Sequence, residues 1–290
     1  MSGNDKYEYP NQVKLEGLSG RHFAIPSSII LDDSMGDKRV TAFSYFATKR
    51  GMDDEVMFTV NDMAEWSGRK PNRIKNGVND RFMQVVERLA DDGYLRISGK
   101  MSHASPAKAT FCFDRVGEAI DENRQFAIIY VDELKKILEY NDFNSKDSFF
   151  NCDVILLVFA YLRMMIFRRK NEMLPSQRNV DGKNDLNYDI EVRRLKYPEA
   201  YNAHYNDIAL VLDISERAVS KAVEVLDKLG LLRFENLPRV KHGDKWRTGQ
   251  TVFCNAYKRE GVCLLDCSDE YAKREISNKK KKIDQLFKRG

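Results

Sequence analysis

The sequence predicts a helix-rich α+β protein, and three observations along its 290 residues lead to that class. Apolar residues recur at helical spacing between Ala218 and Leu229, which indicates an amphipathic helix. Short apolar segments bounded by polar turns follow such helices, as strands do. Several segments of the first half of the chain also reappear, in the same order, in the second half. We therefore expect two copies of one small architecture.

The clearest local pattern is a helix, a tight turn and a second helix over residues 205–229. Asp213 lies at the turn, and Ser215 is a good N-cap because its hydroxyl can accept from the free amides of the next turn. Gly230 ends the second helix, at a position where glycine turns with least strain. This order is typical of a helix-turn-helix, and a strand with its return strand makes the winged variety.

The first half is expected to repeat this order. Helices are predicted over 39–50, 61–66 and 71–92, and strands over 56–58, 94–97 and 109–113. Thr59 followed by Asp62 forms a capping-box pattern before the second helix, and Pro71 suits the first position of the third. Gly77 lies inside the third helix, where glycine costs about 1 kcal/mol relative to alanine. Close approach of another backbone is one reason for a glycine there.

Four short matches align the two halves. They pair 21–25 with 124–128, 61–64 with 206–209, 93–97 with 230–234, and 110–112 with 251–253. Each match is short, and the shared order carries the inference. The third helix of the first half is expected to be longer than its counterpart by about two turns.

The predicted fold is therefore two winged helix-turn-helix domains in tandem. We assign a flexible N-terminal arm to 1–20, the first domain to 21–116, a solvated linker to 117–123, the second domain to 124–260, a mobile inserted loop to 171–203 and a basic C-terminal tail to 261–290. Residues 154–167 are strongly apolar but too short to span a bilayer, so we expect a buried core helix there. The linker is expected to tether two separate domains at short distance.

Basic and amide side chains form a candidate DNA-binding face in the first domain. Projected at helical spacing, they lie opposite or beside the apolar stripe of the predicted third helix. The set is Arg69, Lys70, Asn72, Arg73, Lys75, Asn76 and Asn79. Asparagine pairs with adenine and arginine with guanine through two hydrogen bonds, while lysine suits phosphates. The alternative is a solvated helix, although such helices usually mix both charge signs.

The second domain has two further candidate DNA-contacting regions. They are Arg217, Ser220 and Lys221 near the start of the second helix of the helix-turn-helix, and Arg239, Lys241, Lys245 and Arg247 in the predicted wing. The first residues of that helix reach base edges in this motif, and like charges on a wing suit a phosphate backbone. A plain helical hairpin and an ordinary polar turn are the alternatives.

No catalytic, cofactor or metal site is predicted, so we expect a protein that is not an enzyme. The chain has no P-loop, Gly-x-Ser-x-Gly or His-Glu-x-x-His motif. The spacing of Cys263 and Cys267 suits neither a zinc knuckle nor a redox pair. The net charge of +4 is mild, and the five scattered cysteines and polar N-terminus point to the cytoplasm. We expect association with nucleoid or plasmid DNA and no membrane partner.

The segment FAIP at 23–26, followed by IIL at 29–31 and a predicted helix, resembles the opening of winged-helix domains in replication initiators of Gram-positive plasmids and phages. Two such domains in one chain resemble the tandem winged-helix initiators. The resemblance implies that both domains bind double-stranded DNA repeats, that host replication proteins are recruited, and that the first domain can form a homodimer. The long insert and long third helix depart from that pattern and leave dimerisation open. A winged-helix transcriptional regulator of a mobile element is the alternative.

Overall fold

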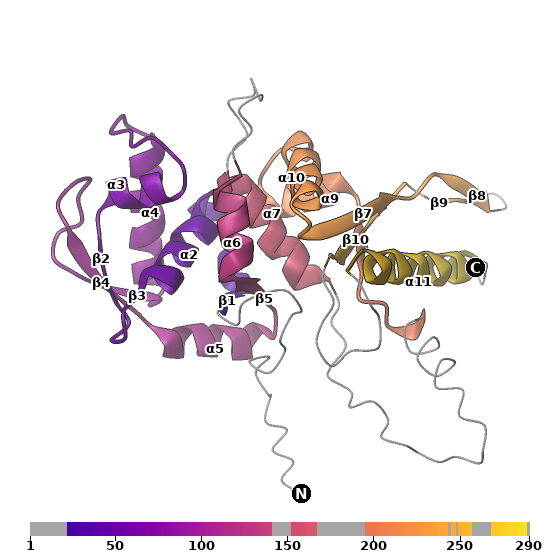
Figure 1. Ribbon diagram of the computed structural model, residues 1–290, viewed down its shortest axis with the longest axis horizontal. Coiled ribbons are helices and arrows are strands. Elements are labelled where there is room, and N and C mark those ends of the chain that lie inside the picture. The colour runs from indigo at the N-terminus through magenta and orange to yellow at the C-terminus, as the bar shows by residue number, and fades with distance from the viewer. Residues whose placement is uncertain are drawn as a thin grey trace, which may run out of the picture.

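The chain folds into helices and small antiparallel sheets (Figure 1), as the sequence predicts for a helix-rich α+β protein. The computed structural model describes residues 22–140, 152–166, 195–242, 245–247, 249–256 and 268–288. The expected N-terminal arm, 1–20, lies outside these residues. No described helix combines the length and the apolar character that crossing a bilayer requires.

The first half surrounds a three-stranded antiparallel sheet in the order β2-β4-β3. Its elements are α2 (Arg39–Lys49), β2 (Glu55–Phe58), α3 (Val60–Trp66), α4 (Val78–Asp91), β3 (Leu95–Ser98) and β4 (Ala107–Phe111). Alternate residues of β4, namely Ala107, Ala109 and Phe111, are buried, as a strand with one covered face requires. The capping box before α3 is confirmed, because Asp62 N donates to Thr59 Oγ1 and Thr59 N donates to Asp62 Oδ2, each at 3.0 Å.

The second half repeats the succession of elements and the strand order, here β6-β10-β7. Its elements are α7 (Cys152–Met165), β6 (Tyr201–Ala203), α9 (Tyr205–Leu212), α10 (Glu216–Lys228), β7 (Leu232–Asn236) and β10 (Thr251–Asn255). The chain between β7 and β10 forms a hairpin of β8 (Val240–His242) and β9 (Lys245–Arg247), which extends beyond the ends of those two strands (Figure 1). The buried core helix expected near 154–167 is confirmed as α7, in which every residue from 155 to 162 is buried.

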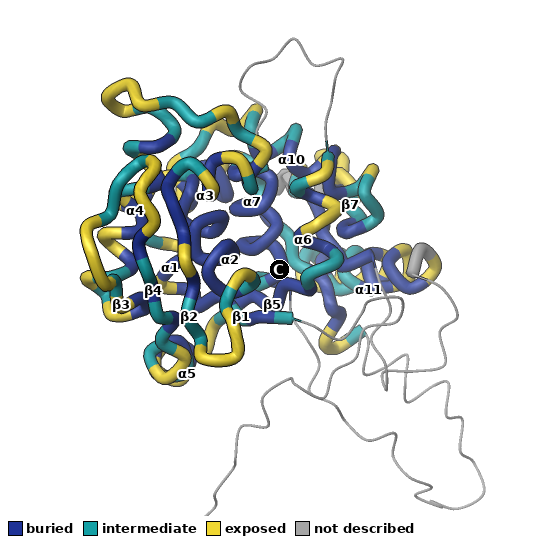
Figure 2. Tube along the Cα trace, turned by 60° about the vertical axis from the view of Figure 1, so that its left-hand side comes forward, coloured by how far each residue is buried: buried dark blue, intermediate teal, exposed yellow. Residues whose placement is uncertain are grey.

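A two-stranded ribbon joins the halves. β1 (His22–Pro26) of the first half pairs antiparallel with β5 (Phe126–Tyr130), and Ala24 lies opposite Ile128. Next to the ribbon in sequence are α1 (Ser27–Ile30), the 3-10 turn η2 (Asp33–Met35), α5 (Phe113–Asn123) and α6 (Val131–Leu138). Helix α2 of the first half packs against α7 of the second, and both are buried at the centre of the molecule (Figure 2).

These contacts overturn the predicted linker. Residues 117–123 are the second part of α5, whose Val116, Ala119 and Ile120 are buried. One continuous hydrophobic core contains side chains of both halves, from Phe23 to Phe253. The halves are therefore parts of one body and not two modules on a solvated tether.

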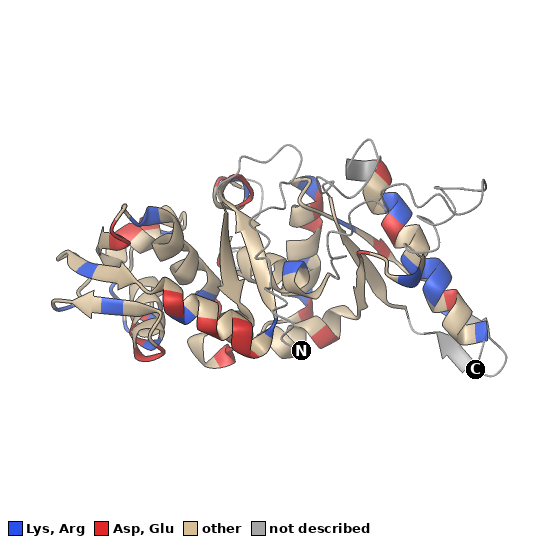
Figure 3. Cartoon of the chain, turned by 90° about the horizontal axis from the view of Figure 1, so that it is seen from below, with Lys and Arg blue, Asp and Glu red and all other residues tan. Residues whose placement is uncertain are grey.

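The predicted basic C-terminal tail, 261–290, is helical over most of its length. Helix α11 (Ser268–Lys288) occupies most of it, while 261–267 and 289–290 lie outside the described residues. Val252 and Cys254 of β10 pack with Tyr271 and Ile276 of α11, whereas Phe253 between them belongs to the main core. Helix α11 therefore covers the second face of this sheet, and most of its lysine residues lie in its C-terminal half, from Lys279 on (Figure 3).

Two other predicted segments have different bounds. Helix α4 begins at Val78 and not at Pro71, so it has 14 residues against 13 in α10. The predicted excess of two turns is therefore wrong. The predicted inserted loop, 171–203, ends in strand β6, whereas 171–194 lies outside the described residues.

Two of the internal matches hold, 61–64 with 206–209 and 93–97 with 230–234, whereas the first and the last slip. Gly93 and Gly230 precede equivalent strands, and both have positive φ, +80° and +69°. The helices after β1 and β5 begin at Ser27 and Val131, which moves the first match by one residue. The last match also slips. Thr251 pairs with Ala203 at the end of β6, and the residue that pairs with the end of β2 is Ala107 and not Thr110. Strand side chains repeat every two residues, so short apolar strings fit several registers.

Candidate nucleic-acid interface

The chain between α3 and α4 is a folded loop and not the start of a helix. Asn79 organises it from the first turn of α4, where its side chain is fully buried. Its Oδ1 accepts from Asn72 N at 2.9 Å, and its Nδ2 donates to Asn61 Oδ1 at 2.7 Å. Asn72 Oδ1 in turn accepts from Ile74 N at 2.9 Å. Such local side-chain bonds offer the backbone an alternative to helix. We call residues 69–77 the basic loop.

The basic loop ends in a tight approach of backbone to backbone. Gly77 is the N-cap of α4, and a Cβ there would lie 2.6 Å from the carbonyl oxygen of Ile74. The close approach that the sequence suggested for this glycine is therefore present, within the loop itself. Asn76 has φ +61°, a left-handed conformation that asparagine tolerates, and its N donates to Asp80 Oδ2 at 3.0 Å. Arg81 Nε donates to the Asn76 carbonyl oxygen at 3.2 Å.

This loop corrects the predicted outer helix face of the first domain. None of Arg69, Lys70, Asn72, Arg73, Lys75 and Asn76 is helical. Lys70, Arg73, Lys75 and Asn76 are exposed on the loop, and Ile74 among them is 70% exposed. Asn79 is in α4 but buried, so it shapes the loop and does not face solvent. The basic surface of the first half is therefore carried by a loop before the helix.

Arg69 has a second role, because it reaches the other half of the molecule. Its Nη2 lies 3.5 Å from Asp153 Oδ2 in α7, and its side chain is 24% exposed. Asn72 is likewise half-buried. These two residues hold the loop in place, whereas their exposed neighbours are available to a ligand.

The region predicted as a helix-turn-helix in the second half consists of α9, a tight turn and α10. Asp213 turns the chain with φ +55°, and Ser215 Oγ accepts from Ala218 N at 3.2 Å. Arg217 is exposed, while Ser220 and Lys221 are half-buried on α10 beside the buried Val219 and Ala222. The first turns of α10 therefore present the predicted side chains at the surface.

The remaining candidates lie on and before the hairpin. Arg239 is exposed just before β8. Lys241 is on β8 opposite Trp246, and Lys245 and Arg247 are on β9 opposite His242 and Val240. The predicted wing is thus a paired β-hairpin whose sequence is basic.

Two features of the interface escaped sequence reasoning. The sequence pattern predicts an outer position for Asn79, although its spacing from the buried Phe82 and Val86 also suits an inward one. Asp153 was not singled out, although an acidic residue in the first turn of an otherwise apolar helix is a visible signal.

Neither a metal site nor a similarity to known proteins assigns a function to this region. Among the described residues, no three His, Cys, Asp or Glu side chains lie together as a metal site requires, and Cys263 and Cys267 lie outside those residues. Comparison of the chain with protein-family models and with curated proteins finds no match.

Proposed function

We propose that this chain is a sequence-specific duplex DNA-binding protein built from two winged helices. The observation that carries the proposal is the repeated order of elements: helix, strand, helix, helix, strand, strand, with the third strand central in both sheets. That order places a helix pair beside a β-hairpin, which is how winged helix-turn-helix proteins approach the major groove. Two independent occurrences in one chain favour this reading over a chance helical hairpin.

The distribution of charge supports the same reading. The basic loop and the first turn of α4 carry Arg69, Lys70, Arg73, Lys75 and Arg81 against Asp80. The hairpin of the second half adds further lysine and arginine residues. Clustered cations bind phosphates and release counterions, which supplies most of the affinity of a DNA-binding protein.

The rigid junction between the halves determines how such a protein would read DNA. Because α2 packs on α7 and β1 pairs with β5, the two readers keep a fixed separation. A pre-organised pair binds without the ordering cost that a flexible tether carries. The target is therefore two half-sites of fixed spacing, and not two sites at variable distance.

The biological role that we propose is replication initiation of a plasmid or phage type, without catalysis by the chain itself. It rests on the resemblance of 23–31 and on the paired winged helices. Host replication proteins and a second copy of the chain are the proposed protein partners. A transcriptional regulator of a mobile element uses the same modules and is the alternative.

The test is selection of bound duplexes from the element's own DNA, followed by footprinting and titration with salt. If about six phosphates are neutralised, log affinity falls against log salt with a slope near −5. Absence of binding at low salt contradicts the DNA-binding proposal. An initiator protects direct repeats beside its gene and supports replication of a plasmid that carries them, whereas a regulator protects a promoter only.

A further inference from the structure

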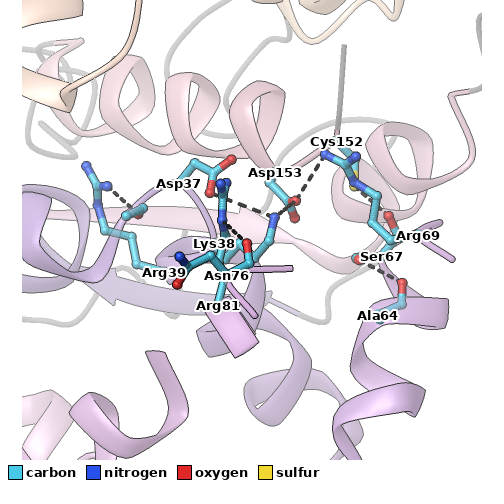
Figure 4. Close-up of polar contacts among 11 residues, drawn as sticks. Asp37, Lys38, Arg39, Ala64, Ser67, Arg69, Asn76, Arg81, Cys152 and Asp153 are labelled. Atoms are coloured by element: carbon cyan, nitrogen blue, oxygen red, sulfur yellow. Dashed lines mark hydrogen bonds and ion pairs between the residues drawn. The ribbon is translucent and has the colours of Figure 1, made fainter. Parts of the chain in front are cut away.

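The first turn of α7, in the second half, touches the root of the basic loop in the first half (Figure 4). Asp153 Oδ2 lies 2.7 Å from Lys38 Nζ at the start of α2 and 3.5 Å from Arg69 Nη2. Cys152 Sγ donates to the Ser67 carbonyl oxygen at 2.7 Å. Two neighbouring residues of α7 thus reach the two ends of the short segment 67–69, directly before the exposed part of the loop.

The Lys38–Asp153 pair is shielded from water. The Asp153 side chain is 0% exposed and that of Lys38 is 3% exposed. Burial raises the pKa of the Cys152 thiol to about 12, so the thiol stays protonated and can donate at neutral pH. Buried charged and polar groups are stabilising only while their partners stay in place, so the position of segment 67–69 is tied to α7.

The rest of the loop is fixed to its own half. Arg69 N donates to the Ala64 carbonyl oxygen at 2.8 Å, and Asn72 is held by Asn79. The exposed Lys70, Arg73 and Lys75 lie on the same loop as these anchors. The contacts of segment 67–69 with Cys152 and Asp153 are therefore the anchors of the loop that come from the second half.

We propose that Cys152 and Asp153 are positioning residues for the DNA-contacting loop of the first half. The inference rests on the proposed function, because the loop is assigned there to DNA. Neither residue contacts the ligand. Each fixes the position of segment 67–69, which directly precedes the exposed basic residues in the chain. Both therefore couple the basic loop of the first half to the core helix α7 of the second.

The Arg69–Asp153 contact is also incomplete in the free protein. Arg69 Nε and Asp153 Oδ1 are buried, and neither has a hydrogen-bond partner among the described residues. A small approach of the loop to α7 completes a two-pronged guanidinium–carboxylate pair, which is stronger than a single bond. We therefore expect loss of the Asp153 carboxylate to release the loop from α7 and to weaken binding through displacement of the exposed basic side chains.

The first experiment compares Cys152→Ala with Cys152→Ser in the full chain. Alanine removes the donor to Ser67, whereas serine keeps one. We expect alanine to weaken binding to a selected duplex about threefold to tenfold, as loss of one hydrogen bond does, and serine to restore it. Cys254→Ala is the matched control, because Cys254 Sγ also donates to a backbone carbonyl, that of Glu199, but under α11. Equal effects of the two alanine variants on affinity contradict the proposal.

The second experiment follows the loop itself, without DNA. Hydrogen exchange of the amides of 70–77 is measured in the wild type, Cys152→Ala and Asp153→Asn. We expect faster exchange in both variants. Glu133→Gln is the control for general destabilisation. Glu133 Oε1 and Arg163 Nη2 form a buried ion pair, 2.7 Å apart, and neither residue belongs to the loop. It should destabilise the protein without a selective effect on 70–77.

The two experiments separate this inference from the proposed function. If 70–77 exchanges at the wild-type rate in Cys152→Ala and Asp153→Asn, the inference is wrong whether or not DNA binds. If the loop loosens but the wild type shows no salt-dependent duplex binding, the loop is positioned as described and the assignment of DNA fails. If Asp153→Asn does not fold, the Cys152 pair of variants still decides the question.

Discussion

The two helix pairs of this protein follow one order and differ in what joins their helices. In the second half, 213–215 makes a tight turn capped by Ser215. In the first half, 67–77 makes a long loop held by Asn72 and Asn79, and it carries the exposed basic residues. The candidate basic residues therefore lie on a loop in the first half. In the second half they lie at the start of α10 and on the β8–β9 hairpin.

The outer faces of the two sheets also differ. Helix α11 covers the outer face in the second half. The corresponding face in the first half is open to solvent, where Met57 is 65% exposed and Lys108 pairs with Glu55 at 2.5 Å. One body thus carries one half closed on both faces and one half closed on a single face.

The largest expected effect comes from cutting the halves apart. Fragments that end at residue 118 or begin at residue 124 separate β1 from β5 and expose Ile25 and Ile129, which are both fully buried. We expect neither fragment to melt cooperatively, and we expect each to bind a selected duplex at least about 100-fold more weakly than the intact chain, because the shared core is lost. Circular dichroism and titration test this. A second fragment that folded and bound as well as the intact protein would restore the tethered-domain picture.

The next comparison uses the second residue of each of the helices α4 and α10. Asn79 and Arg217 are both second residues of their helices, but only Asn79 is buried. Asn79→Ala leaves buried polar groups of the loop unpaired, which costs about 2–4 kcal/mol of unfolding free energy. Arg217→Ala should change it by no more than about 0.5 kcal/mol. Urea denaturation measures both, and similar losses would mean that Asn79 does not organise the loop.

Two glycines give a finer comparison. A Cβ at Gly77 meets the Ile74 carbonyl at 2.6 Å, whereas one at Gly230 meets nothing within 4 Å but sits at φ +69°. Both Gly77→Ala and Gly230→Ala should cost roughly 1–2 kcal/mol of stability, the first by crowding and the second by backbone strain. Only Gly77→Ala should also weaken DNA binding, because it displaces the basic loop. Equal affinities of the two variants would argue against a role for the loop.

Single surface residues are expected to change DNA binding and to leave the stability of the fold nearly unchanged. Arg73→Ala should relax preference for the best site by roughly 1–3 kcal/mol if it contacts a base through two hydrogen bonds. Lys245→Ala in the hairpin should weaken all sequences alike, as loss of a phosphate contact does. Affinities for selected and scrambled duplexes distinguish the two. If Arg73→Ala lowered both affinities equally, the loop would contact phosphates only.

Sequence reasoning reached the elements whose causes are local. The Ser215 cap, the Thr59 capping box and the apolar helix near 154–167 depend on neighbouring residues, and all three are present. The basic loop was missed because Ile74, Val78 and Phe82 continue a helical stripe. The loop forms because Asn79 contacts Asn61, which is distant in sequence, and Asn72, which lies outside a helix.

The junction between the halves was missed for a related reason. Strand β1 finds its partner β5 about 100 residues later, and no local pattern encodes that pairing. The acidic residues at 118, 121 and 122 predict a solvated link, whereas Val116, Ala119 and Ile120 form the buried face of helix α5. Arg217, Ser220 and Lys221 of the second half, in contrast, followed from the helix periodicity and lie on α10.

The proposed function requires that the two halves form one rigid body with two DNA-contacting surfaces. Hydroxyl-radical footprinting of the intact protein on a selected duplex tests it most directly, before and after 5 base pairs are inserted between the protected tracts. We predict two tracts on one face of the duplex, about 10 base pairs apart, and loss of tight binding after the insertion, which turns one half-site to the opposite face. Unchanged affinity with both tracts still protected would show that the halves move independently, and a duplex without protected tracts would contradict DNA binding itself.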